Sequence, residues 1–218
     1  MTVTEELKDY TRKGTTTVGI KCADGIVLAA DKRVTAGGRI VMDKSFNKVF
    51  PISEFMAVTI AGTVSDAQLI SKLLMAEIRL KKVRTGAEPN SEEAANLLTT
   101  IVYQNIRRLS PILGITGFLF AGYDEEGLHL YEIGVDGSLI ESQEYVTDGS
   151  GFMNALGVLD TLYKKDIKVA EGVKLAVKAI NAAIQRDTAT GEGIDVYTIT
   201  SQGVKKVFAE KLNTNITA

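Results

Sequence analysis

Residues 14–33 read GTTTVGIKCADGIVLAADKR, and this stretch decides the fold class. Thr, Val and Ile are concentrated in residues 15–22, and apolar residues return at 26–30 after the dipeptide Asp24-Gly25. β-branched and apolar residues on both sides of an Asp-Gly turn signal predict two antiparallel strands joined as a hairpin. The core of the protein is therefore expected to begin with β-structure.

Outward from this hairpin, strand and helix patterns come in blocks. The sequence predicts strands at 39–42, 48–51, 55–61, 116–123, 128–133, 138–145, 194–200 and 204–209. It predicts helices over 69–78, from Ser91 as N-cap, over 152–163 and over 169–186. Because strands and helices do not alternate one by one, this order predicts an α+β fold of antiparallel sheets. A four-layer αββα sandwich, with two sheets flanked by a helix pair on each side, satisfies the pattern.

Composition narrows the class of protein. The chain has 218 residues, 45% of them hydrophobic and 24% charged, which suits one soluble domain. No apolar run approaches the ~20 residues that cross a bilayer, and the polar leader 1–14 lacks the apolar middle of a secretory signal. A net charge of -2 without a basic block argues against nucleic acid as a partner. One Cys and one His argue against a zinc site and fit a reducing cytoplasm.

The junction Gly14-Thr15 opens the first predicted strand and has a chemical as well as a structural interpretation. By itself a threonine run is ordinarily a strand, because threonine favours β-structure. A threonine at the start of a chain can also use its own α-amine, with a pKa of roughly 7.7–8.0, as a base that activates its hydroxyl. Cleavage after Gly14 would expose both groups, and glycine leaves room for the hydroxyl to attack the preceding carbonyl.

Five downstream segments extend this interpretation. They are 28–37 (LAADKRVTAG), 47–50 (NKVF), 60–62 with 66–68 (IAG, DAQ), 148–151 (DGSG) and 185–191 (QRDTATG), after which 194–196 reads IDV. In this order and spacing they resemble the archaeal-type β subunit of the proteasome, an N-terminal-nucleophile (Ntn) hydrolase and threonine protease. The resemblance covers nearly everything from residue 15 onward and implies the αββα Ntn-hydrolase fold.

The resemblance also implies a role for each matching residue. Thr15 corresponds to the nucleophile and, through its amine, the base, and Asp31 to the acid paired with the catalytic lysine, Lys48. Gly62 corresponds to the backbone N–H that stabilises the oxyanion. Ser150 and Asp187, with Thr190 in place of the family's usual serine, correspond to the groups around the amine. Thr35 corresponds to a residue that binds the substrate backbone, and the implied pocket residues are Val34, Ile60 and Val64.

Two assignments have alternatives. The segment between Thr35 and Lys48 is one residue longer than in the family, which leaves Lys44 as an alternative lysine. Lys48 is preferred because Gly62 is displaced by the same single residue. Ser150 also fits an N-cap of the following helix.

The expected function is that of a threonine endopeptidase made as a zymogen. Self-cleavage would remove the propeptide 1–14 and leave residues 15–218 as a single protease domain without a cofactor or metal. The resemblance implies seven-membered β rings stacked between α rings, an ATP-dependent unfoldase, unfolded polypeptide substrates and no membrane partner. The three aliphatic pocket residues predict cleavage after large hydrophobic residues. Other hypotheses are a catalytically silent ring subunit and the bacterial two-ring relative.

Overall fold

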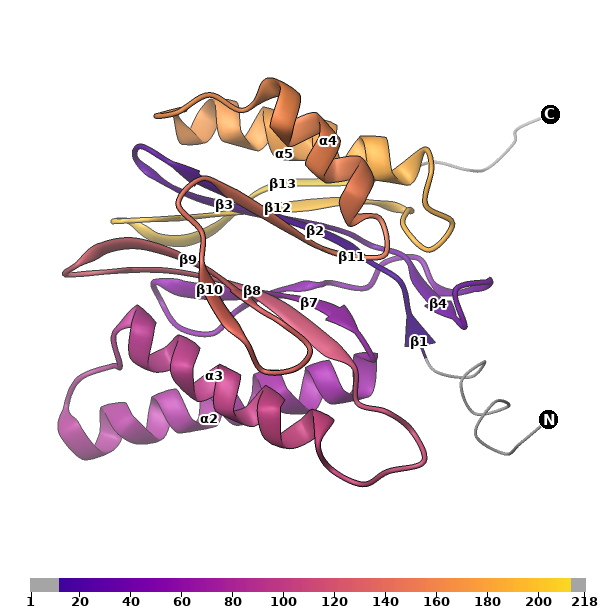
Figure 1. The fold of residues 1–218 in the computed structure, drawn as a ribbon. Coiled ribbons are helices and arrows are strands. Elements are labelled where there is room, and N and C mark those ends of the chain that lie inside the picture. Colours follow the sequence, from indigo (N-terminus) through magenta and orange to yellow (C-terminus); the bar gives the residue numbers. More distant parts are fainter. Residues whose placement is uncertain (1–11, 213–218) are drawn as a thin grey trace.

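The computed structural model describes residues 12–212, and within them the chain forms four layers (Figure 1). The first sheet has the strand order β11-β2-β3-β12-β13. The bounds of these strands are Tyr145–Gly149, Thr16–Cys22, Gly25–Asp31, Gly193–Thr200 and Gly203–Lys211. All neighbouring strands in this sheet are antiparallel. The predicted hairpin is present, with Cys22 opposite Gly25.

The second sheet has the order β10-β9-β8-β7-β6 and is also antiparallel. Its strands span Leu139–Glu141, Gly127–Ile133, Thr116–Asp124, Met56–Gly62 and Val49–Pro51. A short third sheet, β1-β4-β5, comprises Arg12–Lys13, Val34–Ala36 and Ile40–Asp43. The sequence pattern predicted neither β1 nor β4 as a strand.

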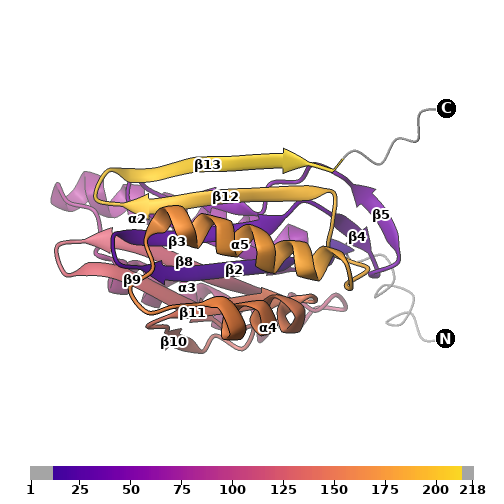
Figure 2. The same ribbon diagram turned by 90° about the horizontal axis from the view of Figure 1, so that it is seen from above.

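Helices α2 (Val64–Thr85) and α3 (Ser91–Ile106) cover the second sheet. Helices α4 (Phe152–Leu162) and α5 (Val169–Ile184) lie over the first sheet, as Figure 2 shows. The α+β sandwich with a helix pair on each side is therefore confirmed. None of these helices is long and apolar enough to span a membrane.

The expected N-cap of α3 was wrong by one residue. Asn90 is the cap, because its side chain accepts a hydrogen bond from the Glu93 backbone N–H while the Glu93 side chain accepts one from the Asn90 N–H. This reciprocal pair is a capping box, which satisfies two backbone donors at the start of the helix. Ser91 is instead the first helical residue.

The predicted strand 138–145 was also wrong as one element. The chain bends after Glu141, and β10 and β11 belong to different sheets. At the bend, the Ser142 backbone N–H donates to Leu130 O and the Ser142 hydroxyl donates to Tyr145 O. This crossing brings the residues after Tyr145 beside β2, where Gly149 pairs with Thr16.

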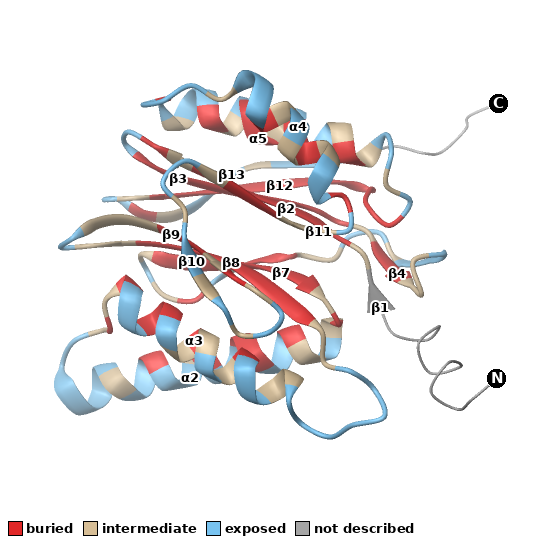
Figure 3. Ribbon diagram, viewed as in Figure 1, coloured by how far each residue is buried: buried red, intermediate tan, exposed pale blue. Residues whose placement is uncertain are grey.

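The apolar core has three parts, and Figure 3 shows buried residues on both sheets and on the helix faces that cover them. One apolar cluster lies under α2 and α3 and another under α4 and α5. A third lies between the sheets and includes Ile26, Leu28, Leu119 and Leu130. Burial of each such side chain contributes about 1.5–3 kcal/mol. Strand β3 is apolar along most of its length because both of its faces are covered.

Candidate active site

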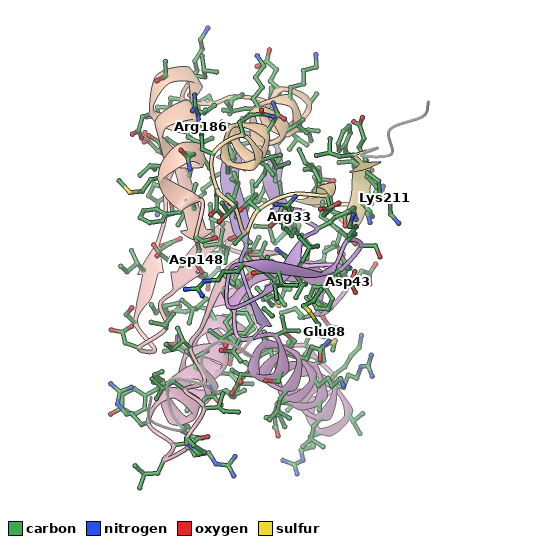
Figure 4. The ribbon with its side chains drawn as sticks, turned by 90° about the vertical axis from the view of Figure 1, so that its right-hand side faces the viewer. Arg33, Asp43, Glu88, Asp148, Arg186 and Lys211 are labelled. Carbon is green, nitrogen blue, oxygen red and sulfur yellow. The ribbon has the colours of Figure 1, made fainter. Side chains whose placement is uncertain are left out.

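Strand ends from the first sheet gather at one end of the sandwich. Asp31, the last residue of β3, pairs with Ile194 near the start of β12, while Thr16 at the start of β2 pairs with Gly149 at the end of β11. Figure 4 looks onto this end of the molecule, where Arg33 and Asp148 are labelled. Antiparallel pairing therefore brings together residues that are more than a hundred positions apart in the sequence.

Asp31 and Lys48 form a buried ion pair at this end. Lys48 Nζ lies 2.8 Å from Asp31 Oδ1, and the two side chains are 2% and 0% exposed. Asp31 also accepts hydrogen bonds from the backbone N–H groups of Thr16 (3.0 Å), Arg33 (3.0 Å) and Gly191 (2.9 Å). The structure therefore places Lys48 beside Asp31 as expected, whereas the alternative Lys44 is exposed to solvent.

The environment of Lys48 changes its acidity. Complete burial lowers the pKa of the Lys48 ammonium below its usual range, and attraction to the Asp31 carboxylate opposes this effect without cancelling it. The Arg33 cation lowers the pKa further. Lys48 is therefore a readier proton donor than an ordinary lysine.

The Gly14-Thr15 peptide bond lies within this network. Gly14 O accepts a hydrogen bond from Lys48 Nζ at 2.8 Å, and the Thr15 hydroxyl also donates to Gly14 O. Gly14 has φ +106°, and a Cβ atom there would lie 2.6 Å from Ala189 Cβ and 2.8 Å from Thr35 Oγ1. Glycine is thus required before Thr15 both by backbone conformation and by space.

Three further predicted residues lie on the other side of Thr15. The Thr15 backbone N–H donates to Ser150 Oγ at 3.4 Å, and the Ser150 hydroxyl donates to Asp187 Oδ2 at 2.6 Å. The Thr190 hydroxyl donates to the same Asp187 oxygen and lies 2.7 Å from Thr16 Oγ1. Ser150 does not cap α4, whose N-cap is Gly151 without a side-chain bond, so the capping alternative was wrong.

The remaining predicted residues lie around this network. Gly62 ends β7 with φ +111°, and a Cβ atom there would overlap Ile115 O, so this strand end needs glycine. Val34 and Ile60 are 2% and 3% exposed, and Val64 at the start of α2 is half-buried. Ile60 belongs to the apolar cluster under α2 and α3.

Thr35 lies in β4, directly beside the residues that precede the junction. In β1, Lys13 pairs antiparallel with Thr35, and Arg12 pairs with Ala36. The end of the leader therefore forms a strand on β4, and Thr35 is 1% exposed beneath it. The part of the leader before residue 12 lies outside the described residues.

Sequence reasoning missed four residues of the site: Thr16, Arg33, Gly191 and Glu192. Thr16 and Gly191 act through backbone N–H groups, whose direction no residue type reveals. Arg33 and Glu192 form an ion pair 159 positions apart in the sequence, with Arg33 Nη2 3.0 Å from Glu192 Oε1. Both residues can be read in the sequence, but nothing in the sequence shows that they form a pair.

Within residues 12–212, no three His, Cys, Asp or Glu side chains are grouped so that they could hold a metal ion.

Comparison with known proteins identifies the family of this chain. Residues 11–199 match the family model described as "Proteasome subunit". The "Proteasome subunit beta" of Methanocaldococcus vulcanius is 41% identical over 203 residues, covering 93% of this chain and 89% of that protein. Those of Nanoarchaeum equitans (41%; 90% and 98%) and Archaeoglobus profundus (40%; 95% and 94%) are similar over comparable shares. The chain therefore belongs to the proteasome subunit family, and its similarity is to archaeal β subunits of that family.

Proposed function

We propose that this chain is a threonine-type endopeptidase subunit of a proteasome core particle, with Thr15 as its N-terminal nucleophile. The observation that carries the proposal is that Lys48 bonds Gly14 O on one side of the Gly14-Thr15 junction, while Ser150, bonded to Asp187, accepts the Thr15 N–H on the other. Each of these side chains is common on protein surfaces, but together they supply a base, a cation and a proton path. A silent ring subunit would have no need of this set.

In the mature chain, the free α-amine of Thr15 takes the proton of its own hydroxyl as Oγ1 attacks the substrate carbonyl. The Lys48 ammonium disfavours protonation of that amine, while Ser150 and Asp187 hold it in place. The negative charge on the carbonyl oxygen is stabilised by the Gly62 N–H. The amine then donates the proton to the leaving nitrogen, and water cleaves the resulting ester.

The leader 1–14 serves as the first substrate in this scheme. Thr15 Oγ1 attacks the Gly14 carbonyl carbon, and charge builds on Gly14 O, where Lys48 already donates a hydrogen bond. The proton lost by Oγ1 passes to the Thr15 nitrogen as the Gly14-Thr15 C–N bond breaks, which leaves a free amine and an ester between Gly14 and Thr15 Oγ1. Water then hydrolyses this ester to release the leader. The pairing of β1 with β4 supports this step, because strand addition is a common way to hold an extended peptide for cleavage.

The proposed setting follows from the family. The chain would occupy seven-membered β rings between α rings in the cytoplasm, and an ATP-dependent unfoldase would deliver unfolded polypeptides to it. Residues 15–218 would form the mature domain. The archaeal β-subunit relatives favour this setting over the bacterial two-ring alternative.

The N-terminus of assembled particles tests the proposal. We expect the intact mass of the β chain, after assembly with α subunits, to be that of a chain beginning at Thr15. Active particles whose β chains still begin at Met1 or Thr2 would overturn it.

A second prediction concerns the residue before the scissile bond. Three aliphatic side chains, Val34, Ile60 and Val64, are proposed to line its pocket, and burial of a large apolar group contributes roughly 1.5–3 kcal/mol. A charged side chain would be desolvated without a partner, since Lys48 is already paired with Asp31. We expect fluorogenic peptides with Leu, Phe or Tyr at this position to show kcat/KM values about ten-fold or more above peptides with Glu or Arg.

Variants of the pocket sharpen the measurement. Ile60→Glu should weaken cleavage after Leu and allow cleavage after Arg, because it brings a carboxylate to an aliphatic wall. Ile60 also packs in the core, so Val64→Glu at a half-buried position provides a second variant with less risk to the fold. Faster hydrolysis after Arg or Glu than after Leu or Tyr by the unmodified protein would refute this preference.

A further inference from the structure

The loop between α5 and β12 is contacted at two points, Thr188 and Glu192, by the side chain of Arg33. Arg33 Nη1 donates to Thr188 O at 2.9 Å, and Arg33 Nε and Nη2 donate to Glu192 Oε1 at 3.3 and 3.0 Å. Between these two attachment points lie Thr190 and Gly191. The planar guanidinium suits this task, because it presents several N–H groups in fixed directions.

Glu192 is an unusual residue for its place. Its φ of 66° lies in the left-handed region, which favours Gly, Asn or Asp over a longer side chain. Its side chain is only 6% exposed, and a buried glutamate ordinarily needs a charged partner. Backbone conformation and burial both disfavour glutamate here, so the ion pair with Arg33 is the feature that accounts for it.

The guanidinium also lies against the loop backbone. A Cβ atom on Gly191 would lie 2.5 Å from Arg33 Cζ, so the guanidinium occupies the space of that missing side chain. The Gly191 N–H points the other way, to Asp31 Oδ2 at 2.9 Å. The same Asp31 oxygen accepts the Arg33 backbone N–H at 3.0 Å. If the loop moved away from the guanidinium, the Gly191 N–H would therefore lose its hydrogen bond to Asp31, the ion-pair partner of Lys48.

We propose that Arg33 and Glu192 form a clamp that positions the 187–192 loop against Asp31 and Thr15. This inference rests on the proposed function, and it assigns both residues as positioning residues that touch no substrate. While the ion pair is formed, Asp187 keeps its hydrogen bond from Ser150 and Thr190 keeps its contact with Thr16. The Gly191 N–H likewise keeps its hydrogen bond to Asp31.

The variant Glu192→Asn separates positioning from stability. Asparagine adopts the left-handed conformation more readily than glutamate, but it is too short to preserve the ion pair. In assembled particles we expect kcat per processed chain to fall about 10- to 100-fold, the loss that a small misplacement of catalytic groups causes. KM should stay within about two-fold and the melting temperature should not fall, because substrate contacts and fold are retained. Intact mass gives the fraction of chains that have lost the leader. Complete retention of the leader in assembled rings would support the clamp as well, because leader removal is proposed to use the same catalytic groups as peptide hydrolysis.

A double-mutant cycle checks that the two residues act together. Arg33→Met should cause a similar loss of kcat, and the double variant should lose no more than either single variant, because each change opens the same clamp. Lys82→Met removes the exposed ion pair with Glu88 and is the matched control, expected to leave kcat unchanged.

Different results would overturn the clamp and the protease function. A kcat within about two-fold of the unmodified protein for Glu192→Asn overturns the clamp, as do additive losses in the cycle. A fall in kcat that appears only with a lowered melting temperature overturns it too, because that would report a role in folding. If Thr15→Ala is inactive while Glu192→Asn is fully active, the clamp is wrong and the protease function stands. Full activity of Thr15→Ala would instead overturn the function itself.

Discussion

Replacement of Thr15 by alanine is expected to leave the leader attached and to abolish peptidase activity. The variant lacks the hydroxyl that we propose attacks both the Gly14 carbonyl and the substrate, and no other hydroxyl is bonded to Gly14 O within residues 12–212. Removal of a catalytic nucleophile costs several orders of magnitude in kcat, and we expect a fall of about 10⁴-fold or more. Intact mass and hydrolysis of a fluorogenic peptide, measured on the same assembled particles, give the two readouts.

The variants Thr17→Val and Thr15→Ser provide matched controls. Thr17→Val keeps the shape and β-branching of the residue and removes a hydroxyl that, within the described part of the chain, bonds only Asp148 O, so activity should stay within a few-fold. Thr15→Ser keeps a hydroxyl in place and should retain both leader removal and measurable turnover. Leader loss at the Gly14-Thr15 bond in the Thr15→Ala variant would show that another protease performs this step.

The fold was largely predictable because its core strands carry strong local signals. The β2–β3 hairpin has β-branched residues on both sides of a turn, and α5 has an apolar face that recurs at helical spacing. Local signals failed where long-range pairing decides the structure. The segment 138–145 (SLIESQEY) contains no Gly or Pro to mark a break, yet β10 ends at Glu141 on β9 and β11 begins at Tyr145 on β2.

The side chains of the site could be predicted from the sequence, because their chemistry is specific. The backbone groups of the site could not be predicted. Lys48 beside Asp31, and Ser150 with Asp187, were expected from the resemblance, and the structure brings them together. The strand formed by the end of the leader was not expected, because two residues carry no pattern. The left-handed conformation of Glu192 was invisible for a related reason, since nothing in the sequence sets its φ except contacts made by the folded chain.

Replacement of Lys48 is expected to remove nearly all turnover while rings still assemble. Without this cation, the Thr15 amine keeps its proton at neutral pH more readily, and Gly14 O loses its charged donor. We expect kcat of the Lys48→Ala variant to fall by about 10²–10⁴-fold, the range associated with a general acid-base group. Leader removal should slow as well, which intact mass measured at successive times after assembly would detect.

The fold should tolerate this change better than an ordinary broken buried ion pair. Loss of one partner of such a pair costs about 3–5 kcal/mol when the remaining charge has no other bonds. Asp31 keeps three backbone N–H donors, from Thr16, Arg33 and Gly191, so its carboxylate stays bonded in the variant. Lys48→Met fills the space of the lysine stem and should match Lys48→Ala in activity while it unfolds at a higher temperature.

Lys44→Ala is the control that the sequence itself provides. Lys44 was the alternative assignment created by the one-residue insertion before Lys48, yet it is exposed and lies outside the network around Asp31. Its removal should leave kcat within about two-fold, because a solvated lysine contributes little to a buried site. A mild Lys48→Ala together with an inactive Lys44→Ala would mean that the chain rearranges on maturation so that the other lysine reaches Thr15. The structure argues for a large loss of activity in Lys48→Ala and a small one in Lys44→Ala, because Lys48 Nζ is buried 2.8 Å from both Asp31 Oδ1 and Gly14 O, where the proposed reaction would use its positive charge.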